Sequence, residues 1–173
     1  MLAMTGGEIH DNHPFATPED LRDPVRQFRG RLAAPVTVIT SGGPGAWAGL
    51  TVSSIVVAEG TPSLVYFLCG TINDVWDRIL DTGRFVVHVL EDEHRELSEV
   101  FAGYRPQPGG MFASLDVADG THGPVIESIG TRADVSYRSH QGDELALVEG
   151  AVDAVTLHDL TDPLQWFRGS YLG

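Results

Sequence analysis

The chain has 173 residues, a length that buries about two-thirds of its unfolded surface around a single core, so it fits one ordinary domain. Its 24 acidic and 11 basic side chains give a formal net charge of −13, and such a field repels nucleic acid. No apolar run approaches the roughly 20 residues of a membrane-spanning helix and no leader stands at the start, which excludes a membrane protein and predicts a cytoplasmic one.

Residues 1–17 show no hydrophobic periodicity, and we expect a flexible N-terminal arm there, followed by one domain over residues 18–173. A short helix is predicted to begin at Thr17, because threonine caps helices and the proline after it suits a first turn. Asp23-Pro24 is expected to interrupt or restart this helix, since the residue before a proline avoids helical angles.

Stretches rich in β-branched and aromatic residues predict strands along the rest of the chain. They cover residues 36–40, 46–52, 63–68, 85–90, 129–138 and 144–157. The Gly- and Pro-containing residues 41–45 separate the first two, which is typical of a hairpin turn. The run at 85–90 lacks regular polar alternation and predicts a strand that is buried on both faces.

Helices are predicted between the later strands. One begins at Asn73 or Asp74 and ends at Gly83, and another follows Asp92 and ends at Gly103. The apolar face of the first is expected to hold Val75, Trp76, Ile79 and Leu80. Residues 104–124, rich in Pro and Gly, predict a long loop, which in a compact domain is usually functional or packs on a partner.

This order of elements predicts the fold class. Many short strands with two to four short helices between them favour an α+β, mainly β domain. Its sheet is expected to be an antiparallel barrel that is closed or nearly closed.

The sequence lacks the motifs of metal sites, nucleophilic serines and phosphate loops. No HExxH motif and no histidine pair at i, i+4 occurs among the seven histidines, so no metal site is expected. No G-x-S-x-G motif supports a nucleophilic serine, and no Lys-Ser or Lys-Thr pair after residues 41–45 supports a phosphate loop. Cys69, the single cysteine, forms no internal disulfide and is expected to be a small buried apolar residue.

The stretch GLTVSS, residues 49–54, places three hydroxyl groups within four residues, just before the apolar run 55–58. Such hydroxyls often bond backbone groups at a turn, so a capping turn is one interpretation. The mouth of a barrel is also a common small-molecule site, where hydroxyls and free amides suit carbonyls, ring nitrogens and phosphates. The residues by themselves leave both interpretations open.

Three stretches in this order resemble the flavin reductase-like family of FMN-binding split barrels. They read PVTVIT from Pro35, GLTVSSIVVAEGTPSLVYFLC from Gly49, and NDVWDRILDTGRF with VVHVL from Asn73. The ending PLQWFRGSY also resembles the usual close of that family, so the similarity covers roughly residues 24–171. The resemblance rests on the order of these stretches along the chain, because none of them alone is specific to the family.

The resemblance implies an antiparallel split β-barrel that forms a homodimer, with the flavin between the subunits. It implies an NAD(P)H:flavin oxidoreductase, in which NADH or NADPH passes a hydride to bound FMN or FAD. Many members of the family supply reduced flavin to a partner monooxygenase, which is therefore a candidate partner here.

The flavin-binding residues implied by the resemblance are Thr51, Val52, Ser53, Ser54, Leu68, Cys69, Gly70, Asn73 and Asp74. The turn at 51–54 matches the part that holds the isoalloxazine and ribityl chain through amides and hydroxyls. The strand end at 68–70 matches the part beside the ring, and the helix start matches the part that receives the phosphate. Candidate partners for the ring face, each equally suited to core or interface packing, are Trp47, Met111, Phe112 and Trp166.

The sequence departs from the family pattern at three places. Ser and Thr are common in members where Asn73 to Val75 stand, and the carboxylate of Asp74 repels a phosphate unless arginines or helix amides offset it. Glu144 stands where members carry a histidine near the nicotinamide, so Glu144 and His140 are the candidates for that side. His88 stands where Asn is frequent, and a lone histidine in a buried strand is typical of a hydrogen-bonded core residue.

Three functions therefore remain open from the sequence. The first is an NAD(P)H:flavin oxidoreductase, in which no acid or base residue is compulsory. The second is a flavin carrier or sensor of the same fold, which Glu144 in place of the family histidine favours. The third is a split-barrel oxidoreductase with tightly bound flavin or deazaflavin that acts on an organic substrate. Glu144 and the acidic surface mildly disfavour the extra phosphate of NADPH.

Overall fold

The computed structural model describes residues 23–159 and 161–172. The arm expected over residues 1–17 and the helix expected from Thr17 lie outside the described residues. Helix α1 (Pro24–Gly30) begins directly after Asp23, whose carboxylate accepts hydrogen bonds from two amides of the first turn. A helix therefore begins at Pro24, while the interruption or restart expected at Asp23-Pro24 depends on residues outside the description.

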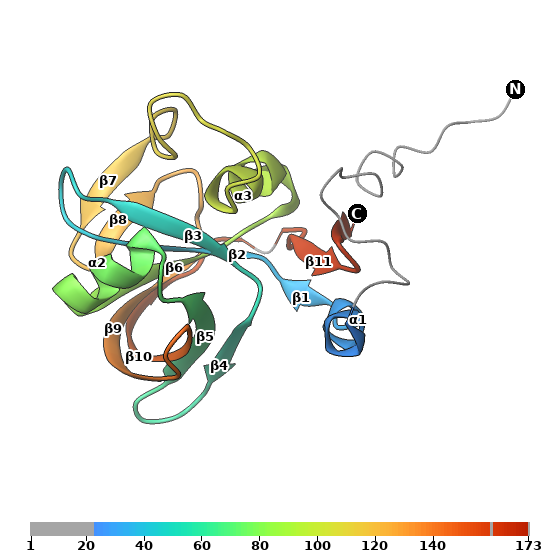
Figure 1. Ribbon diagram of the computed structural model, residues 1–173. Coiled ribbons are helices and arrows are strands. Elements are labelled where there is room, and N and C mark those ends of the chain that lie inside the picture. The colour runs from blue at the N-terminus through green and yellow to red at the C-terminus, as the bar shows by residue number, and fades with distance from the viewer. Residues whose placement is uncertain (1–22, 160, 173) are drawn as a thin grey trace, which may run out of the picture.

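The body of the domain is a seven-stranded antiparallel sheet. Its strands are β2 (Thr37–Ser41), β3 (Ala48–Val52), β4 (Ile55–Ala58), β5 (Leu64–Gly70), β6 (Arg84–Val89), β9 (Arg132–Gln141) and β10 (Leu145–Thr156). They are ordered β3-β2-β6-β9-β10-β5-β4, and the sheet curls so that its two edge strands are joined through Ser53-Ser54 (Figure 1). The curled sheet confirms the predicted α+β, mainly β split barrel.

The predicted strands all occur, with shifted ends. The largest shift is at 129–138, where strand β9 runs Arg132–Gln141 and Ile129 lies buried before it. The strand predicted to be buried on both faces is β6, in which the four residues 85–88 are all buried. The expected hairpin at 36–52 is formed by β2 and β3, which pair in antiparallel register.

Helix α2 (Asp74–Thr82) lies against β2, β3 and β6. Asn73 is its N-cap residue without a side-chain capping bond, and Gly83 ends the helix at a φ of 67°, an angle at which glycine is favoured. Val75, Trp76 and Ile79 are buried as predicted. Leu80 is 47% exposed, so its predicted place on the buried face is wrong, because it lies one residue further around the helix.

Helix α3 (Arg95–Phe101) follows a short 3-10 turn, η2 (Asp92–His94), and packs on the outer side of β3 (Figure 1). The apolar residues of the domain form two cores, one that includes α2 and one that includes the end of α3. The core inside the barrel holds Phe67 and Phe85, and the core beneath α3 holds Leu90 and Phe101. Strand β2 contributes to both, because Val38 and Ile39 point to opposite faces of the sheet.

Six short strands were not predicted, and one of them is β4 at the edge of the seven-stranded sheet. The hairpin of β7 (Val117–Gly120) and β8 (Gly123–Ile126) occupies the end of the stretch expected to be a loop over 104–124, so the loop is shorter than predicted. The others form a separate three-stranded sheet: β1 (Ala34–Pro35), β11 (Gln165–Phe167) and β12 (Ser170–Leu172). This sheet and α1 project from the side of the barrel (Figure 1). No helix in the described ranges has the length and apolar character needed to cross a membrane.

Candidate functional site

The end of β3 and the turn between β3 and β4 together carry three hydroxyl groups with different surroundings. The hydroxyl of Thr51 donates to the carbonyl of Ser98 in α3 at 2.7 Å, so it joins the helix to the barrel. Ser54 accepts hydrogen bonds from the amide of Leu68, through its carbonyl at 3.2 Å and its hydroxyl at 3.4 Å. Among the described residues, nothing bonds the hydroxyl of half-buried Ser53. Thr51 therefore ties the end of β3 to α3, Ser54 ties the turn to β5, and the hydroxyl of Ser53 is available to a ligand.

The end of β5 lies beside this turn. Leu68 points outward and is partly exposed, whereas the side chain of Cys69 lies in the barrel core with 1% of its surface exposed. Burial raises the pKa of the Cys69 thiol to about 11, so the group stays protonated and is a poor nucleophile. The expectation of a buried apolar Cys69 is confirmed, and only its main chain is open to a ligand.

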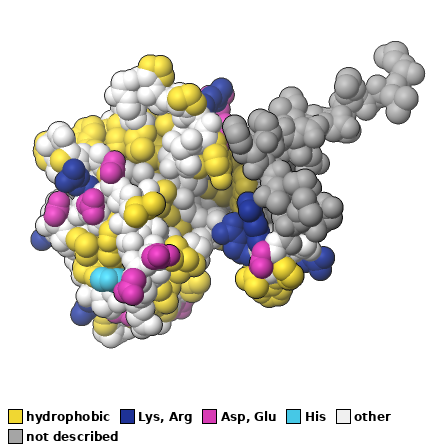
Figure 2. All heavy atoms as spheres, viewed as in Figure 1, with side chains coloured by type: hydrophobic (Ala, Val, Ile, Leu, Met, Phe, Trp, Pro, Cys, Tyr) yellow, Lys and Arg dark blue, Asp and Glu magenta, His cyan; other side chains and the backbone are white. Residues whose placement is uncertain are grey.

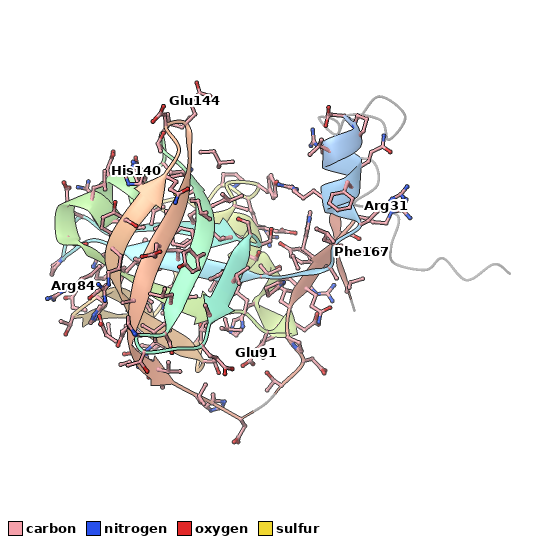
Figure 3. All side chains as sticks on the ribbon, turned by 90° about the horizontal axis from the view of Figure 1, so that it is seen from below. Arg31, Arg84, Glu91, His140, Glu144 and Phe167 are labelled. Atoms are coloured by element: carbon pink, nitrogen blue, oxygen red, sulfur yellow. The ribbon has the colours of Figure 1, made fainter. Side chains whose placement is uncertain are left out.

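The loop from β5 to α2 is fastened to the tip of the β9–β10 hairpin. Thr71 donates its hydroxyl to the Asp143 carbonyl at 2.7 Å and its amide to the Glu144 carbonyl at 3.0 Å. Glu144 stands exposed at the tip of that hairpin, and His140 lies further down β9 (Figure 3). The ring of His140 packs on the edge of Trp76 at 4.8 Å, and its Nδ1 lies 2.7 Å from the Tyr137 hydroxyl. The two nicotinamide-side candidates thus have separate surroundings.

A cleft of about 640 Å³ opens beside the first turn of α2. Three segments line it: residues 45–49 at the start of β3, residues 72–74 at the start of α2, and residues 109–112 of the loop after α3. We call it the Trp47 cleft, because Trp47 packs edge to face on Phe112 at 5.6 Å within it. Gly49 lets Phe101 and Phe112 pack on β3 beside this cleft, since a Cβ there would lie 2.6 Å from Cδ1 of Phe101 and 3.4 Å from Cζ of Phe112.

The polar groups of the Trp47 cleft are poorly satisfied by the protein. The indole N–H of Trp47 is shielded from solvent and has no hydrogen-bond partner among the described residues, a state that costs about 1–3 kcal/mol. Asn73 makes no capping bond, and Asp74 is an exposed acid in the first turn of α2. Asn73 and Asp74 are therefore open to a ligand in the cleft, whereas the indole N–H of Trp47 is shielded.

The structure brings some of the sequence-based candidates together and separates another. The turn at 51–54 and Leu68 are hydrogen-bonded neighbours, and Asn73, Asp74, Trp47, Met111 and Phe112 share the cleft. Trp166 packs against Tyr171 at 5.0 Å in the core beneath α3 and lines neither that cleft nor the turn. Its contact with a flavin stays a prediction.

Two lining segments of the cleft were not singled out from the sequence. Ile72 is 98% exposed at the rim, and Gly109-Gly110 forms the opposite wall. The Pro- and Gly-rich composition of the loop was the signal for the second segment. A fully exposed isoleucine has no sequence signal, because its exposure depends on how the loop before α2 is tied to the β9–β10 hairpin.

A smaller cleft of about 310 Å³ lies between α3 and the loop after it. Beside it, Glu91, Glu93 and His94 place ligand atoms within 4.8 Å of one another. Two of these side chains already cap the turn η2, since the Glu91 carboxylate accepts from the His94 amide and Nδ1 of His94 accepts from the Glu91 amide. The cluster is therefore explained by helix capping.

Comparison with known proteins finds flavin reductases by both sequence and structure. A sequence model of the family described as Flavin reductase like domain matches residues 29–173. The reductase subunit HsaB of a flavin-dependent monooxygenase from Mycobacterium tuberculosis is 30% identical over 152 residues, which cover 86% of this chain and 80% of HsaB. The FMN reductase (NADH) RutF from Stutzerimonas stutzeri is 26% identical over 162 residues, covering 92% of this chain and 91% of RutF.

Among solved structures, the flavin reductase PheA2 in its native state superposes with a TM-score of 0.77 at 25% identity. The match covers 87% of this chain and 97% of PheA2. The matched family model spans the barrel, the 51–54 turn and the Trp47 cleft. The chain therefore belongs to the flavin reductase-like domain family.

Proposed function

We propose that this protein is an NAD(P)H-dependent flavin reductase that serves as the reductase component of a two-component monooxygenase. The observation that carries the proposal is the family match over residues 29–173. In support, the hydroxyl of Ser53 has no hydrogen-bond partner among the described residues. The relatives named above are a monooxygenase reductase subunit and an FMN reductase that uses NADH. RutF supports NADH as the electron donor and flavin as the acceptor, and HsaB supports a monooxygenase as the partner.

The turn at 51–54 fits the isoalloxazine ring through the chain's own groups. The free hydroxyl of Ser53 and the amides around it offer donors to a ring carbonyl, while the small residues let the backbone come close to a flat ring. A flavin bound here supplies the hydride acceptor, and the protein supplies its position. Thr51 and Ser54 hold the turn in place through their bonds to Ser98 and Leu68.

No side chain of the site has to act as an acid or base in this proposal. The thiol of Cys69 stays protonated, because burial raises its pKa to about 11. Glu144 and His140 are candidates for the nicotinamide side, and the fastening of Glu144 to Thr71 keeps the hairpin tip next to the start of α2. Positioning is expected to supply most of the rate, as hydride transfer needs close stacking of the two rings.

A homodimer is part of the proposal, because apolar side chains remain exposed on two surfaces. One surface is the outer side of the sheet where Val56, Leu68, Leu145 and Leu147 lie on the neighbouring strands β4, β5 and β10. The other is α1, on which Val25 and Phe28 are exposed; Figure 2 shows hydrophobic atoms on this helix and an open space between it and the barrel. A second copy of the chain would cover both surfaces.

A cytoplasmic location is also proposed. Its support is the buried free thiol of Cys69, which suits a reducing compartment.

The proposed activity is tested by mixing the purified full-length protein with NADH and following NADH absorbance with and without added FMN or FAD. We expect oxidation that depends on both protein and flavin, and the same measurement with NADPH decides the nicotinamide preference. Tight flavin binding without oxidation of either nicotinamide would indicate a flavin carrier. Product formed from an organic substrate after free flavin is removed would instead indicate an oxidoreductase with resident flavin.

A further inference from the structure

The cleft of about 310 Å³ beside α3 is lined largely by apolar residues, and we call it the α3 cleft. These residues come from α3 and from the loop after it: Leu97, Val100, Phe101, Met111 and Leu115. Phe101 is buried in the core beneath α3, and Leu97, Met111 and Leu115 pack against that core. Small-molecule sites have volumes of about 300–1,000 Å³, so the α3 cleft suits a ligand with a single ring.

Two polar contacts hold the loop in place at the rim of the α3 cleft. Nη1 of Arg105 lies 2.9 Å from Oε1 of Glu96 on α3, which joins the loop to the helix. The side-chain amide of Gln107 donates to the Ser114 hydroxyl at 2.9 Å, which joins the two arms of the loop. All four residues line the cleft, so its walls are formed by contacts within the protein.

His94 brings an unused hydrogen-bond donor to the α3 cleft, which it lines with a side chain that is 7% exposed. Its Nδ1 accepts from the Glu91 amide at 3.1 Å, so the ring proton is on Nε2. Nε2 makes no hydrogen bond within the described residues, and Oε1 of Glu93 lies 3.8 Å from it. In that part of the chain, the unpartnered side-chain atom that solvent cannot reach is Nε1 of Trp47. Nε2 of His94 is therefore accessible to a molecule in the cleft.

The space between His94 and the Glu93 carboxylate suits a hydroxyl group. Their two atoms are too far apart for a direct hydrogen bond, but a hydroxyl oxygen between them accepts from Nε2–H and donates to the carboxylate. A carboxylate ligand has no proton to donate. It is also repelled by Glu93 and Glu96, of which Arg105 balances only one. The polar groups of the cleft therefore favour an uncharged ligand that carries a hydroxyl.

The α3 cleft is connected to the ring-binding turn through the helix itself. Leu97 and Val100 line the cleft, and Ser98 lies between them in the sequence. The carbonyl of Ser98 accepts the hydroxyl of Thr51 at 2.7 Å, so the position of α3 determines how the end of β3 is held. A ligand that packs on α3 therefore stabilises the arrangement that also holds the 51–54 turn.

We propose that the α3 cleft binds a small uncharged phenol and that this ligand is an effector that strengthens flavin binding. The ring packs on Phe101 and Met111, since aromatic rings interact favourably with other rings and with thioether sulfur. The hydroxyl bridges His94 and Glu93. A helix that one ligand has already ordered costs less to order for the second, so phenol and flavin favour each other's binding. The effector role rests on the proposed function, whereas the phenol site does not.

The phenol site is tested by calorimetric titration of the flavin-free, full-length protein with phenol, toluene and benzoate. We expect one phenol to bind per chain. Toluene has the same ring without the hydroxyl, and benzoate carries a charge that Glu93 and Glu96 repel. Both should bind at least about fivefold more weakly than phenol.

A variant of His94 separates a contact with the ligand from a general loss of structure. His94→Asn keeps a side-chain acceptor for the Glu91 amide but has no donor at the position of Nε2. It should weaken phenol binding about three- to tenfold and leave toluene binding unchanged. His158→Asn is the matched control, because it makes the same substitution at an exposed histidine outside the cleft. A merely structural role of His94 would weaken phenol and toluene alike.

The effector role is tested by titrating FMN, followed by flavin fluorescence, with and without saturating phenol. Phenol should raise FMN affinity at least about twofold, and FMN should raise phenol affinity by the same factor. Thr51→Val removes the bond to Ser98, so it should abolish this mutual effect while phenol still binds.

The phenol site is overturned if phenol gives no saturable heat, if toluene binds as tightly, or if His94→Asn weakens both ligands alike. The effector role is overturned if phenol leaves FMN affinity unchanged or if Thr51→Val retains the mutual effect. Flavin-dependent NADH oxidation by a protein that binds no phenol would overturn this inference and leave the proposed function standing. A protein that binds phenol but no flavin would overturn the proposed function together with the effector role, and the phenol site would stand.

Discussion

The imidazole of His88 accepts a hydrogen bond from the backbone N–H of Ile126, with 3.2 Å between the amide nitrogen and Nε2. On its other side, Nδ1 lies 3.3 Å from the carbonyl oxygen of Val38. The fully buried ring thus joins β6 to β2 and to β8 as a neutral donor and acceptor. This confirms the expectation of a hydrogen-bonded core histidine and makes it a source of pH-dependent stability.

Burial lowers the pKa of His88 from 6.5 to about 4, an effect that the bond to Val38 only partly opposes. As pH falls from 6.5 to about 4, the unfolded chain takes up a proton at this residue and the folded chain does not. The free energy of unfolding should therefore fall by roughly 3 kcal/mol across this range from His88 alone. Urea unfolding at several pH values measures it.

His88→Asn should lower stability at neutral pH by about 1–3 kcal/mol and flatten the dependence between pH 6.5 and about 4. His158→Asn is the control, because this histidine is exposed. An unchanged slope in the His88 variant would contradict the account.

Ser53 and Thr51 should behave differently when their hydroxyls are removed. Ser53→Ala should weaken flavin binding about three- to tenfold with little change in melting temperature, since this hydroxyl makes no bond within the described chain. Thr51→Val should lower the free energy of unfolding by about 1 kcal/mol, because it removes the bond to Ser98. Flavin titration and thermal unfolding of both variants test the contrast, and the opposite pattern would reject it.

Gly49 is expected to tolerate no side chain. A Cβ there would lie 2.6 Å from Cδ1 of Phe101 and 3.4 Å from Cζ of Phe112, so Gly49→Ala should lower the free energy of unfolding by about 1–3 kcal/mol. Gly43→Ala is the matched control, because a Cβ there meets nothing within 4 Å. Equal stability of the two variants would show that the packing over β3 is looser than described.

Cys69 should resist thiol reagents in the folded protein. Its side chain is buried, and its pKa of about 11 keeps the thiolate scarce at mildly alkaline pH. Labelling should be slow in buffer and rapid and complete in denaturant, as followed by absorbance of the released reagent. Flavin-dependent NADH oxidation should survive exposure to the reagent, and rapid stoichiometric labelling of the native protein would contradict this.

The proposed dimer predicts a sensitive position on the outer side of the sheet. Leu147→Glu should shift the protein from dimer to monomer, because it places a charge opposite Leu68 on the exposed apolar surface. Leu157→Glu is the control: this leucine is exposed but lies beyond the far end of β10. Sedimentation of the wild type and the two variants measures their oligomeric state. A wild-type protein that is monomeric at micromolar concentration would reject the dimer.

Local sequence signals were sufficient to predict the helices and strands whose ends are marked by particular residues. Gly83 stops α2 where predicted, and within the run 85–90 residues 85–88 are buried on both faces as expected, although Val89 is exposed. The strands β1, β11 and β12 were missed because each has two or three residues and gains its pairing only from a distant part of the chain. The Val117–Ile126 hairpin was missed because a Pro- and Gly-rich surrounding masked it.

The site was predictable as a segment but not in its details. The stretch GLTVSS marked the turn, yet the sequence could not tell which hydroxyl is free, since that depends on where α3 places the Ser98 carbonyl. The Trp47 cleft is assembled from three segments that are far apart in the sequence, so no local pattern reports it. The exposure of Ile72 likewise follows from tertiary contacts of Thr71.

The most direct measurement is the rate of NADH oxidation at fixed flavin concentration, compared between the wild-type protein and Ser53→Ala. If the turn after β3 holds the flavin, the wild type oxidises NADH only when flavin is added, and the variant needs several-fold more flavin to reach half of its maximal rate. The account is contradicted if neither protein responds to flavin, or if the variant responds at the same flavin concentration as the wild type.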